Sequence, residues 1–141
     1  MSIEQNKANF RAIPELVLNT GDFYRVDELF AAEFIEHGPG SPGVPANSAT
    51  FKAYFTMLRN AFPNLHYTIE VLVAEGDLVA GYLTANGTQT GEFMGAPATG
   101  TRVTWTETHI GRYADGKLVE HWLNYDQLGL MQQLGVIPSM G

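Results

Sequence analysis

The chain has 141 residues, a length that fits one domain, and we expect a single domain over residues 1–141. Fifteen acidic residues against eight basic ones give a net charge of −7, and cysteine is absent. Because phosphate backbones and anionic membranes bind clustered Lys and Arg, this composition argues against both partners, and the lack of cysteine excludes disulfides and thiolate chemistry.

The first residues of the chain are predicted to be helical. The N-terminus is polar, and no apolar run approaches the roughly 20 residues that span a bilayer, so we expect a soluble, cytoplasmic protein. Residues 2–19 predict a helix, in which Ser2 and Gln5 form a capping-box pattern and Pro14 introduces a kink. Residues 22–32 predict a second, short helix.

A loop is expected to separate these helices from a third one. Residues 34–37 predict a short strand, and the Gly- and Pro-rich residues 38–45 predict a segment without regular structure. Ser48 is expected to cap a helix that runs to about Phe62, with Phe55 among the aromatic residues that recur at helical spacing.

The rest of the chain is mostly predicted strand. Four long strands are expected, over residues 65–74, 78–90, 101–114 and 117–125. Gly76-Asp77 and Asp115-Gly116 mark tight hairpin turns, and Asp-Gly favours type I′. Residues 91–100 are expected to form a flexible loop, and a short helix is expected after Asp126.

Helices gathered before antiparallel strands imply an α+β fold rather than a parallel α/β fold. We expect a cone-shaped barrel, in which a curved antiparallel sheet of about four long strands and three N-terminal helices surround an internal pocket. Such an interior is a natural site for a small organic ligand.

The last hairpin carries the side chains best suited to chemistry. With Asp115 and Gly116 as the turn, counting outward predicts the cross-strand pairs His109–Trp122, Glu107–Asn124 and Trp105–Asp126. Side-chain alternation then places these six residues on one face of the sheet and His121 on the other. Burying the polar ones without partners costs several kcal/mol each by rough estimate, whereas a pocket relieves that cost, and an apolar wall suits a carboxylate to proton transfer.

Each of these residues also has a structural interpretation. Asp126 is a favoured N-cap for the helix that follows, and His109 is compatible with a satisfied core histidine. Glu107 and Asn124 are compatible with a cross-strand hydrogen bond, and tryptophans are more often core than ligand platform. The four histidines show no metal-ligand spacing, so we expect no metal.

Several stretches resemble the SnoaL-like polyketide cyclases, also called ester cyclases, of the nuclear-transport-factor-like superfamily. Together they cover nearly the whole chain, and they are Asn19–Asp22, Phe34–His37, Phe51–Pro63, Thr90–Gly100, Ala114–Trp122 and Asp126–Gly135. The resemblance implies an intramolecular aldol closure without a cofactor, with Asp126 as acid/base. It also implies that His109 lines the pocket, that Glu107 is a polar pocket residue and that His37 lies near the pocket mouth.

Two neighbouring enzyme classes fit less well. Ketosteroid isomerases use a helix-borne tyrosine, and the first helix here offers Phe10 instead. Limonene-epoxide-hydrolase-like enzymes pair two aspartates with an arginine, whereas the matching strand here offers Glu107 and His109.

The sequence therefore predicts a cofactor-independent cyclase or isomerase acting on a small polyketide-like carbonyl compound, with Asp126 as acid/base and His109 assisting. Substrate contacts are expected from His37, Trp105, Glu107, Trp122, Asn124 and Phe55. Three alternatives stay open: a non-catalytic binding protein for an apolar molecule, an epoxide-hydrolase-like enzyme, and an interaction protein that uses the outer sheet face. A homodimer formed through the sheet is expected by analogy with the superfamily.

Overall fold

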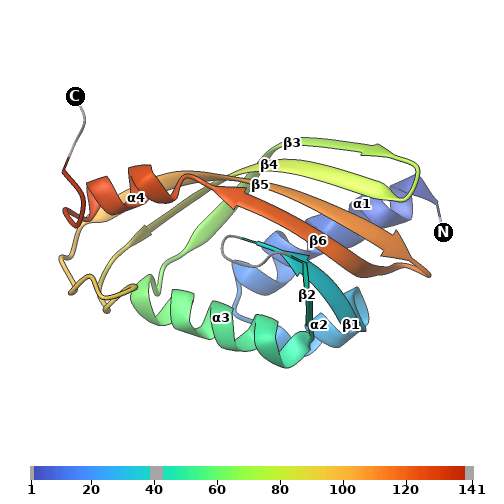
Figure 1. Cartoon of the computed structure of the whole chain (residues 1–141), viewed down its shortest axis with the longest axis horizontal. Coiled ribbons are helices and arrows are strands. Elements are labelled where there is room, and N and C mark those ends of the chain that lie inside the picture. Colours follow the sequence, from blue (N-terminus) through green and yellow to red (C-terminus); the bar gives the residue numbers. More distant parts are fainter. Residues whose placement is uncertain (1, 39–42, 139–141) are drawn as a thin grey trace.

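The computed structural model describes residues 2–38 and 43–138, and one six-stranded sheet dominates it. The helices are α1 (Ile3–Ala12), α2 (Val26–Leu29), α3 (Ser48–Ala61) and α4 (Gln127–Gln133). The strands are β1 (Phe30–His37), β2 (Val44–Ala46), β3 (His66–Glu75), β4 (Leu78–Thr88), β5 (Arg102–Ala114) and β6 (Lys117–Tyr125). The strand order in the sheet is β2-β1-β6-β5-β4-β3 (Figure 1).

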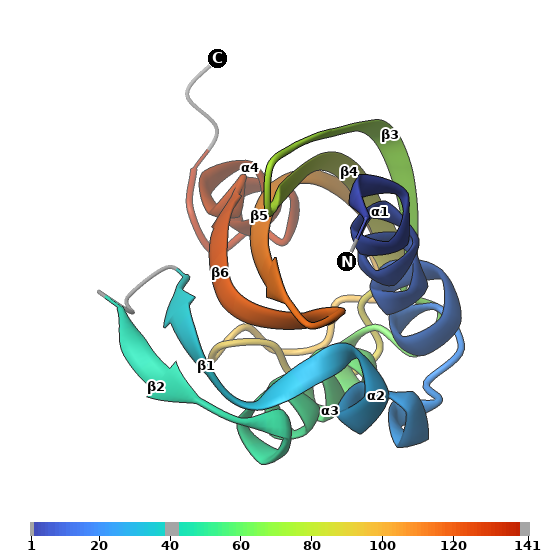
Figure 2. The same cartoon turned by 90° about the vertical axis from the view of Figure 1, so that its right-hand side faces the viewer.

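The sheet curls around an interior that α1 and α3 cover on its concave side (Figure 2). The prediction of an α+β fold with four long strands is confirmed, but the prediction of an antiparallel barrel is wrong. The sheet is mixed because β1 runs parallel to β6, and it stays open with β2 and β3 at its edges. No helix among the described residues is long and apolar enough to cross a bilayer.

The N-terminal helix begins for the predicted reason but is interrupted earlier than its predicted end at residue 19. The Ser2 hydroxyl accepts the Gln5 N–H at 3.1 Å, and the Gln5 side chain accepts the Ser2 N–H at 3.0 Å, which completes the capping box. Pro14 lacks an N–H group, and the backbone from Ile13 to Leu18 is a π-helix that continues α1.

The second predicted helix is shorter than expected. A 3-10 turn (Phe23–Arg25) and α2 occupy its first part, and β1 begins at Phe30. Phe30 and Phe34 are both buried, and a spacing of four residues puts side chains on one face in a strand as well as in a helix. Pairing with β6 decides in favour of the strand, since Phe30 lies opposite Leu118.

The loop before α3 also differs in part from the prediction. Val44–Ala46 forms β2, which pairs antiparallel with β1, while residues 39–42 of the predicted loop lie outside the described residues. The N-cap of α3 is Asn47 rather than Ser48, because the Asn47 side chain accepts the Thr50 N–H at 3.1 Å.

Both predicted hairpins are present, but the second contains a bulge that the sequence analysis missed. Ala114 pairs with Lys117 as predicted, and Tyr113 pairs with Leu118, but Arg112 then pairs with Glu120. Val119 is therefore an extra residue in β6, and every later residue of β6 shifts by one position. A shift of one residue moves each side chain to the opposite face of the sheet.

Candidate functional site

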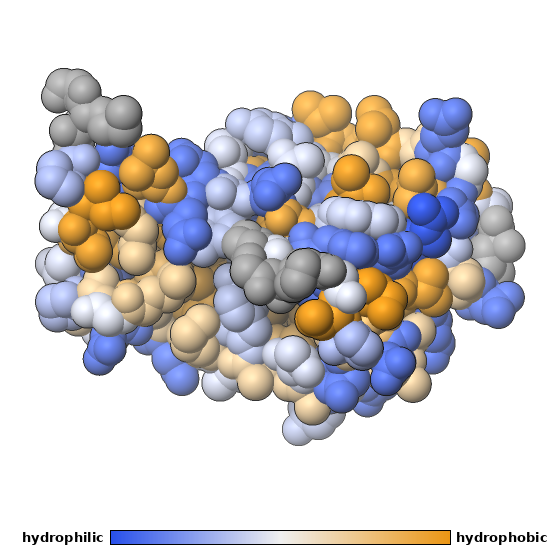
Figure 3. Space-filling view, in the orientation of Figure 1, coloured by the Kyte–Doolittle hydropathy of each residue, from blue (hydrophilic) through white to orange (hydrophobic). Residues whose placement is uncertain are grey.

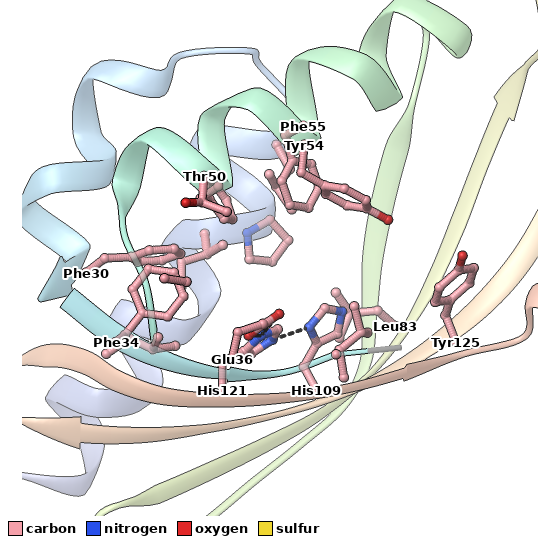
Figure 4. Close-up of a pocket in the computed structure, with 18 of the residues that line it drawn as sticks. Phe30, Phe34, Glu36, Thr50, Tyr54, Phe55, Leu83, His109, His121 and Tyr125 are labelled. Carbon is pink, nitrogen blue, oxygen red and sulfur yellow. Dashed lines mark hydrogen bonds and ion pairs between the residues drawn. The ribbon is translucent and has the colours of Figure 1, made fainter. Parts of the chain in front are cut away.

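A cavity of about 700 Å³ lies between the concave face of the sheet and the helices α1 and α3 (Figure 4). Its walls are mainly apolar and include Phe10, Phe30, Phe34, Phe51, Phe55 and Leu83. This size and lining are typical of pockets that bury small organic molecules.

Four titratable side chains form a continuous hydrogen-bonded line on the floor of this cavity. His121 Nδ1 lies 2.6 Å from a carboxylate oxygen of Glu36 on β1. His121 Nε2 lies 2.8 Å from His109 Nδ1, and His109 Nε2 lies 2.7 Å from the Glu107 carboxylate. Glu36, His121 and His109 contribute to the lining (Figure 4), and we call the four residues the Glu36–Glu107 relay.

The inner end of the relay is fixed by the core. Glu107 is only 6% exposed, and its second oxygen accepts the Trp105 indole N–H at 2.7 Å and the Tyr67 hydroxyl at 3.3 Å. Strand alternation places Trp105, Glu107 and His109 on the concave face of β5, as predicted. A buried carboxylate with three donors has the partners that make burial of its charge tolerable.

The geometry of the relay fixes its proton count. Each of the three contacts is a hydrogen bond only when one proton lies between its two atoms. Two neutral imidazoles supply two protons, so two ionised carboxylates and two imidazoles must hold one proton more. The relay then carries a net charge of −1, because one imidazolium accompanies two carboxylates.

Burial decides where the third proton lies. Desolvation lowers the pKa of His121 below its ordinary value, and the hydrogen bond that His121 donates to Glu36 opposes this only in part. A neutral His121 donates its Nδ1–H to Glu36 and accepts at Nε2 from His109 Nδ1–H. A His109 ring that also donates from Nε2 to the ionised Glu107 carboxylate then holds the third proton.

Two phenols add to the polar part of the cavity lining. Tyr54 from α3 and Tyr125 from β6 line it, and Figure 4 shows Tyr125 on the sheet on the same side as His109, with Tyr54 extending from the helix opposite. Desolvation and the charge of Glu107 raise the pKa of Tyr125, and desolvation is the main cause that raises the pKa of Tyr54. Both phenols therefore stay protonated at neutral pH and are available as hydrogen-bond donors.

The low pKa of His121 predicts a stability that depends on pH. Below the unfolded pKa of about 6.5, the unfolded chain takes up a proton on His121 that the folded protein does not take up, so the contribution of His121 to the free energy of unfolding falls as the pH falls. The stabilisation is fully present above this pH. Urea unfolding of the wild type and of His121→Gln at about pH 7.5 and 5.5 checks this. The variant is expected to lose less stability than the wild type, and equal losses would contradict the assignment.

The structure places the predicted site residues on both faces of the sheet. His109 and Phe55 line the cavity, and Glu107 and Trp105 lie directly behind it. The prediction that Trp122 and Asn124 share this face is wrong, because the bulge at Val119 turns them to the convex face.

The convex face also holds His37, which was expected near the pocket mouth. Its ring stacks on Trp122 with the centroids 4.9 Å apart, and its Nε2 lies 2.7 Å from the Glu120 carboxylate. His37 follows the cavity-lining Glu36 in β1, and alternation sends it to the other side.

Asp126 and His109 do not meet in one hollow, which corrects the geometry expected from the sequence. Asp126 is exposed and caps α4, where its carboxylate accepts the Gly129 N–H at 2.9 Å. It does not contribute to the lining of the cavity. The capping interpretation accounts for the described hydrogen bond of its side chain.

Sequence reasoning missed Glu36, His121, Tyr54 and Tyr125 as cavity residues. His121 was expected on the face opposite the pocket and Trp122 on the pocket face. Both expectations are wrong for the same reason, because a bulge leaves no mark in the hydrophobic pattern of β6. One feature of the sequence does point to Glu36. It lies two residues after the apolar Phe34 on a predicted strand, so the two side chains share one face. Within residues 2–38 and 43–138, no group of three or more His, Asp or Glu side chains is arranged to hold a metal ion.

The fold and the site together define a protein with a mainly apolar cavity beside a hydrogen-bonded line of titratable groups. The SnoaL-like polyketide cyclase family model matches residues 7–134, so the chain belongs to this family, and the resemblance seen in the sequence is confirmed.

Relatives that are named as cyclases fit this assignment. The aklanonic acid methyl ester cyclase DnrD of Streptomyces peucetius is 34% identical over 123 residues, which are 83% of this chain and 82% of the relative. The nogalonic acid methyl ester cyclase of Streptomyces nogalater is 29% identical over 118 residues, which are 83% of this chain and 88% of that protein. The crystal structure of IdmH from Streptomyces antibioticus superposes with a TM-score of 0.83 at 33% identity and covers 94% of this chain and 99% of its own.

Proposed function

We propose that the protein is a cofactor-independent cyclase that closes a ring in a polyketide carbonyl compound by an intramolecular aldol reaction. The observation that carries this proposal is the Glu36–Glu107 relay on the floor of an otherwise apolar cavity. Ring closure of this kind needs one proton taken from carbon and one proton given to oxygen, and the relay offers a group for both steps.

Glu36 is the group that acts on the substrate. Its carboxylate lines the cavity and keeps acceptor capacity beyond the bond from His121. It removes a proton from the carbon next to a carbonyl, and the carbanion then attacks a second carbonyl of the same molecule. The carboxylic acid returns the proton to the alkoxide that forms, so the reaction is an isomerisation in which all atoms balance.

The rest of the site stabilises the negative charge that appears during these steps. The hydroxyls of Tyr54 and Tyr125 are available to donate to the enolate or alkoxide oxygen, because both phenols stay protonated. The imidazolium of His109 is separated from Glu36 only by His121, and its positive charge favours the ionised form of the Glu36 carboxylate. Asp126 has no part in this mechanism because its carboxylate is exposed and engaged at the start of α4.

The test is an assay of ring closure with the two compounds that give the relatives their names, aklanonic acid methyl ester and nogalonic acid methyl ester. Conversion is followed by separating substrate from product, with mass detection to show that the mass is unchanged. Binding of both compounds without conversion would instead support a non-catalytic binding protein.

His109→Gln is expected to slow ring closure by about 10-fold or more, because the positive charge of the relay is lost. The acid limb of the pH profile of kcat is expected to move to higher pH, which a purely structural role of His109 would not produce. An unchanged profile would remove His109 from the mechanism.

A further inference from the structure

The loop between β4 and β5 contains a tight turn with an unusual residue at its tip. Phe93 and Ala96 exchange backbone hydrogen bonds of 3.0 and 2.8 Å, and the two residues between them have positive φ values, +48° for Met94 and +85° for Gly95. Two successive positive φ values define a type I′ turn, whose first central position favours Asn, Asp or Gly. A long side chain with a Cβ atom is disfavoured there.

The turn between β5 and β6 provides an internal comparison. Asp115 and Gly116 have φ values of +52° and +79°, so the backbone adopts the same turn with a favoured residue at its first position. Met94 and Asp115 are the only described residues other than glycine with positive φ. This hairpin lies at the far end of the sheet from α4 and the Met94 turn (Figure 1).

The surrounding structure imposes the conformation of Met94. Gln89 is fully buried, donates to the Ala96 carbonyl at 3.1 Å and accepts from the Thr99 hydroxyl at 2.8 Å. Phe93 is buried as well, with its ring edge-on to Phe62 at 5.3 Å. Both ends of the turn are therefore anchored, and its tip cannot relax into a more favourable backbone conformation.

The anchored tip projects a thioether to the mouth of the cavity. Met94 lines the cavity and is also 53% exposed, and its sulfur accepts the Gln127 side-chain N–H at 3.9 Å. Tyr54 and Met57 of α3 line the cavity and are similarly exposed. More apolar side chains are exposed around α4 at this end of the molecule, as Figure 3 shows, among them Leu128, Val136 and Ile137.

We propose that Met94 is a specificity-determining residue, which packs its thioether against the distal ring of an extended, planar substrate whose reacting part lies on the Glu36–Glu107 relay. Strained backbone persists only where the surrounding structure over-determines it, and such residues cluster at active sites and ligand clamps. A polarizable sulfur beside an aromatic ring is a favourable contact. The inference rests on the proposed function for the substrate, but its test does not use turnover.

The test compares Met94→Asn with a reciprocal control. Met94→Asn creates Asn-Gly, the favoured type I′ pair, and is expected to raise Tm by about 2–4 °C. It is also expected to weaken binding of the four-ring probe 1-hydroxypyrene by about 2- to 10-fold, the range of a sulfur–aromatic contact. Binding of the two-ring probe 1-naphthol is expected to change less than 1-hydroxypyrene binding. Both affinities are measured by fluorescence titration.

The control is Asp115→Met, which places the same disfavoured pair, Met-Gly, in the distant hairpin. It is expected to lower Tm by a similar amount and to leave the binding of both probes unchanged. The proposal is overturned if Met94→Asn fails to raise Tm, if 1-hydroxypyrene binds it as tightly as the wild type, or if the control variant weakens binding equally. Failure of the proposed cyclase reaction is seen separately, as loss of conversion without any change in these titrations.

Discussion

Glu36→Gln is expected to lower the rate of ring closure by about 10²- to 10⁴-fold, the contribution of a positioned acid/base group. The amide keeps the size of the side chain, and its oxygen still accepts the His121 Nδ1–H, so the cavity keeps its shape. An amide does not bind a proton near neutral pH, so the variant has no group at this position that can take up the proton from carbon or return it to oxygen. The measurement is single-turnover conversion of the methyl esters, which separates the chemical step from binding.

Asp126→Asn is the matched control for this experiment. Asparagine caps helices about as well as aspartate, and the Gly129 N–H keeps an acceptor, so stability and turnover are both expected to stay near wild type. A large loss in Asp126→Asn together with full activity in Glu36→Gln would reverse the assignment and restore the role that the family resemblance gave to Asp126.

The contrast between Glu36 and Asp126 shows which features of the protein can be predicted from its sequence. Both hairpins, the capping box and the bounds of β6 follow from local signals, namely Asp-Gly and Gly-Asp turns, a Ser-x-x-Gln pattern and strand alternation. These features depend on residues close together in the chain, and the predictions for them are confirmed.

The site depends on a feature that local signals do not encode. One extra residue, Val119, exchanges the two faces of β6, brings His121 to His109 and turns Trp122 away from the cavity. The second partner of His121 is Glu36, which is 85 residues away in the chain and arrives through the parallel pairing of β1 with β6. Hydrophobic periodicity predicts neither the bulge nor this pairing. Together they determine that Glu36, and not Asp126, is the carboxylate that lines the cavity.

The relay also predicts one substitution that destabilises the fold strongly. Glu107→Ala leaves the Trp105 N–H, the Tyr67 hydroxyl and the His109 imidazolium without their acceptor in a buried place. Removing one partner of a buried ionic network costs about 3–5 kcal/mol of the free energy of unfolding. Urea unfolding near pH 7.5 is expected to show this as a lower midpoint with an unchanged slope.

Glu107→Gln separates the two roles of this carboxylate, which are to accept hydrogen bonds from buried donors and to supply a negative charge beside His109. The amide oxygen accepts from Trp105 and Tyr67, and the amide group donates to a neutral His109, so most of the lost stability is expected to return. The negative charge that holds the extra proton on His109 is absent, and ring closure is expected to stay about 10-fold or more below wild type. A stable and fully active Glu107→Gln would show that the relay needs only hydrogen bonds at this end. An Ala variant as stable as the Gln variant would show that the buried donors do not depend on Glu107.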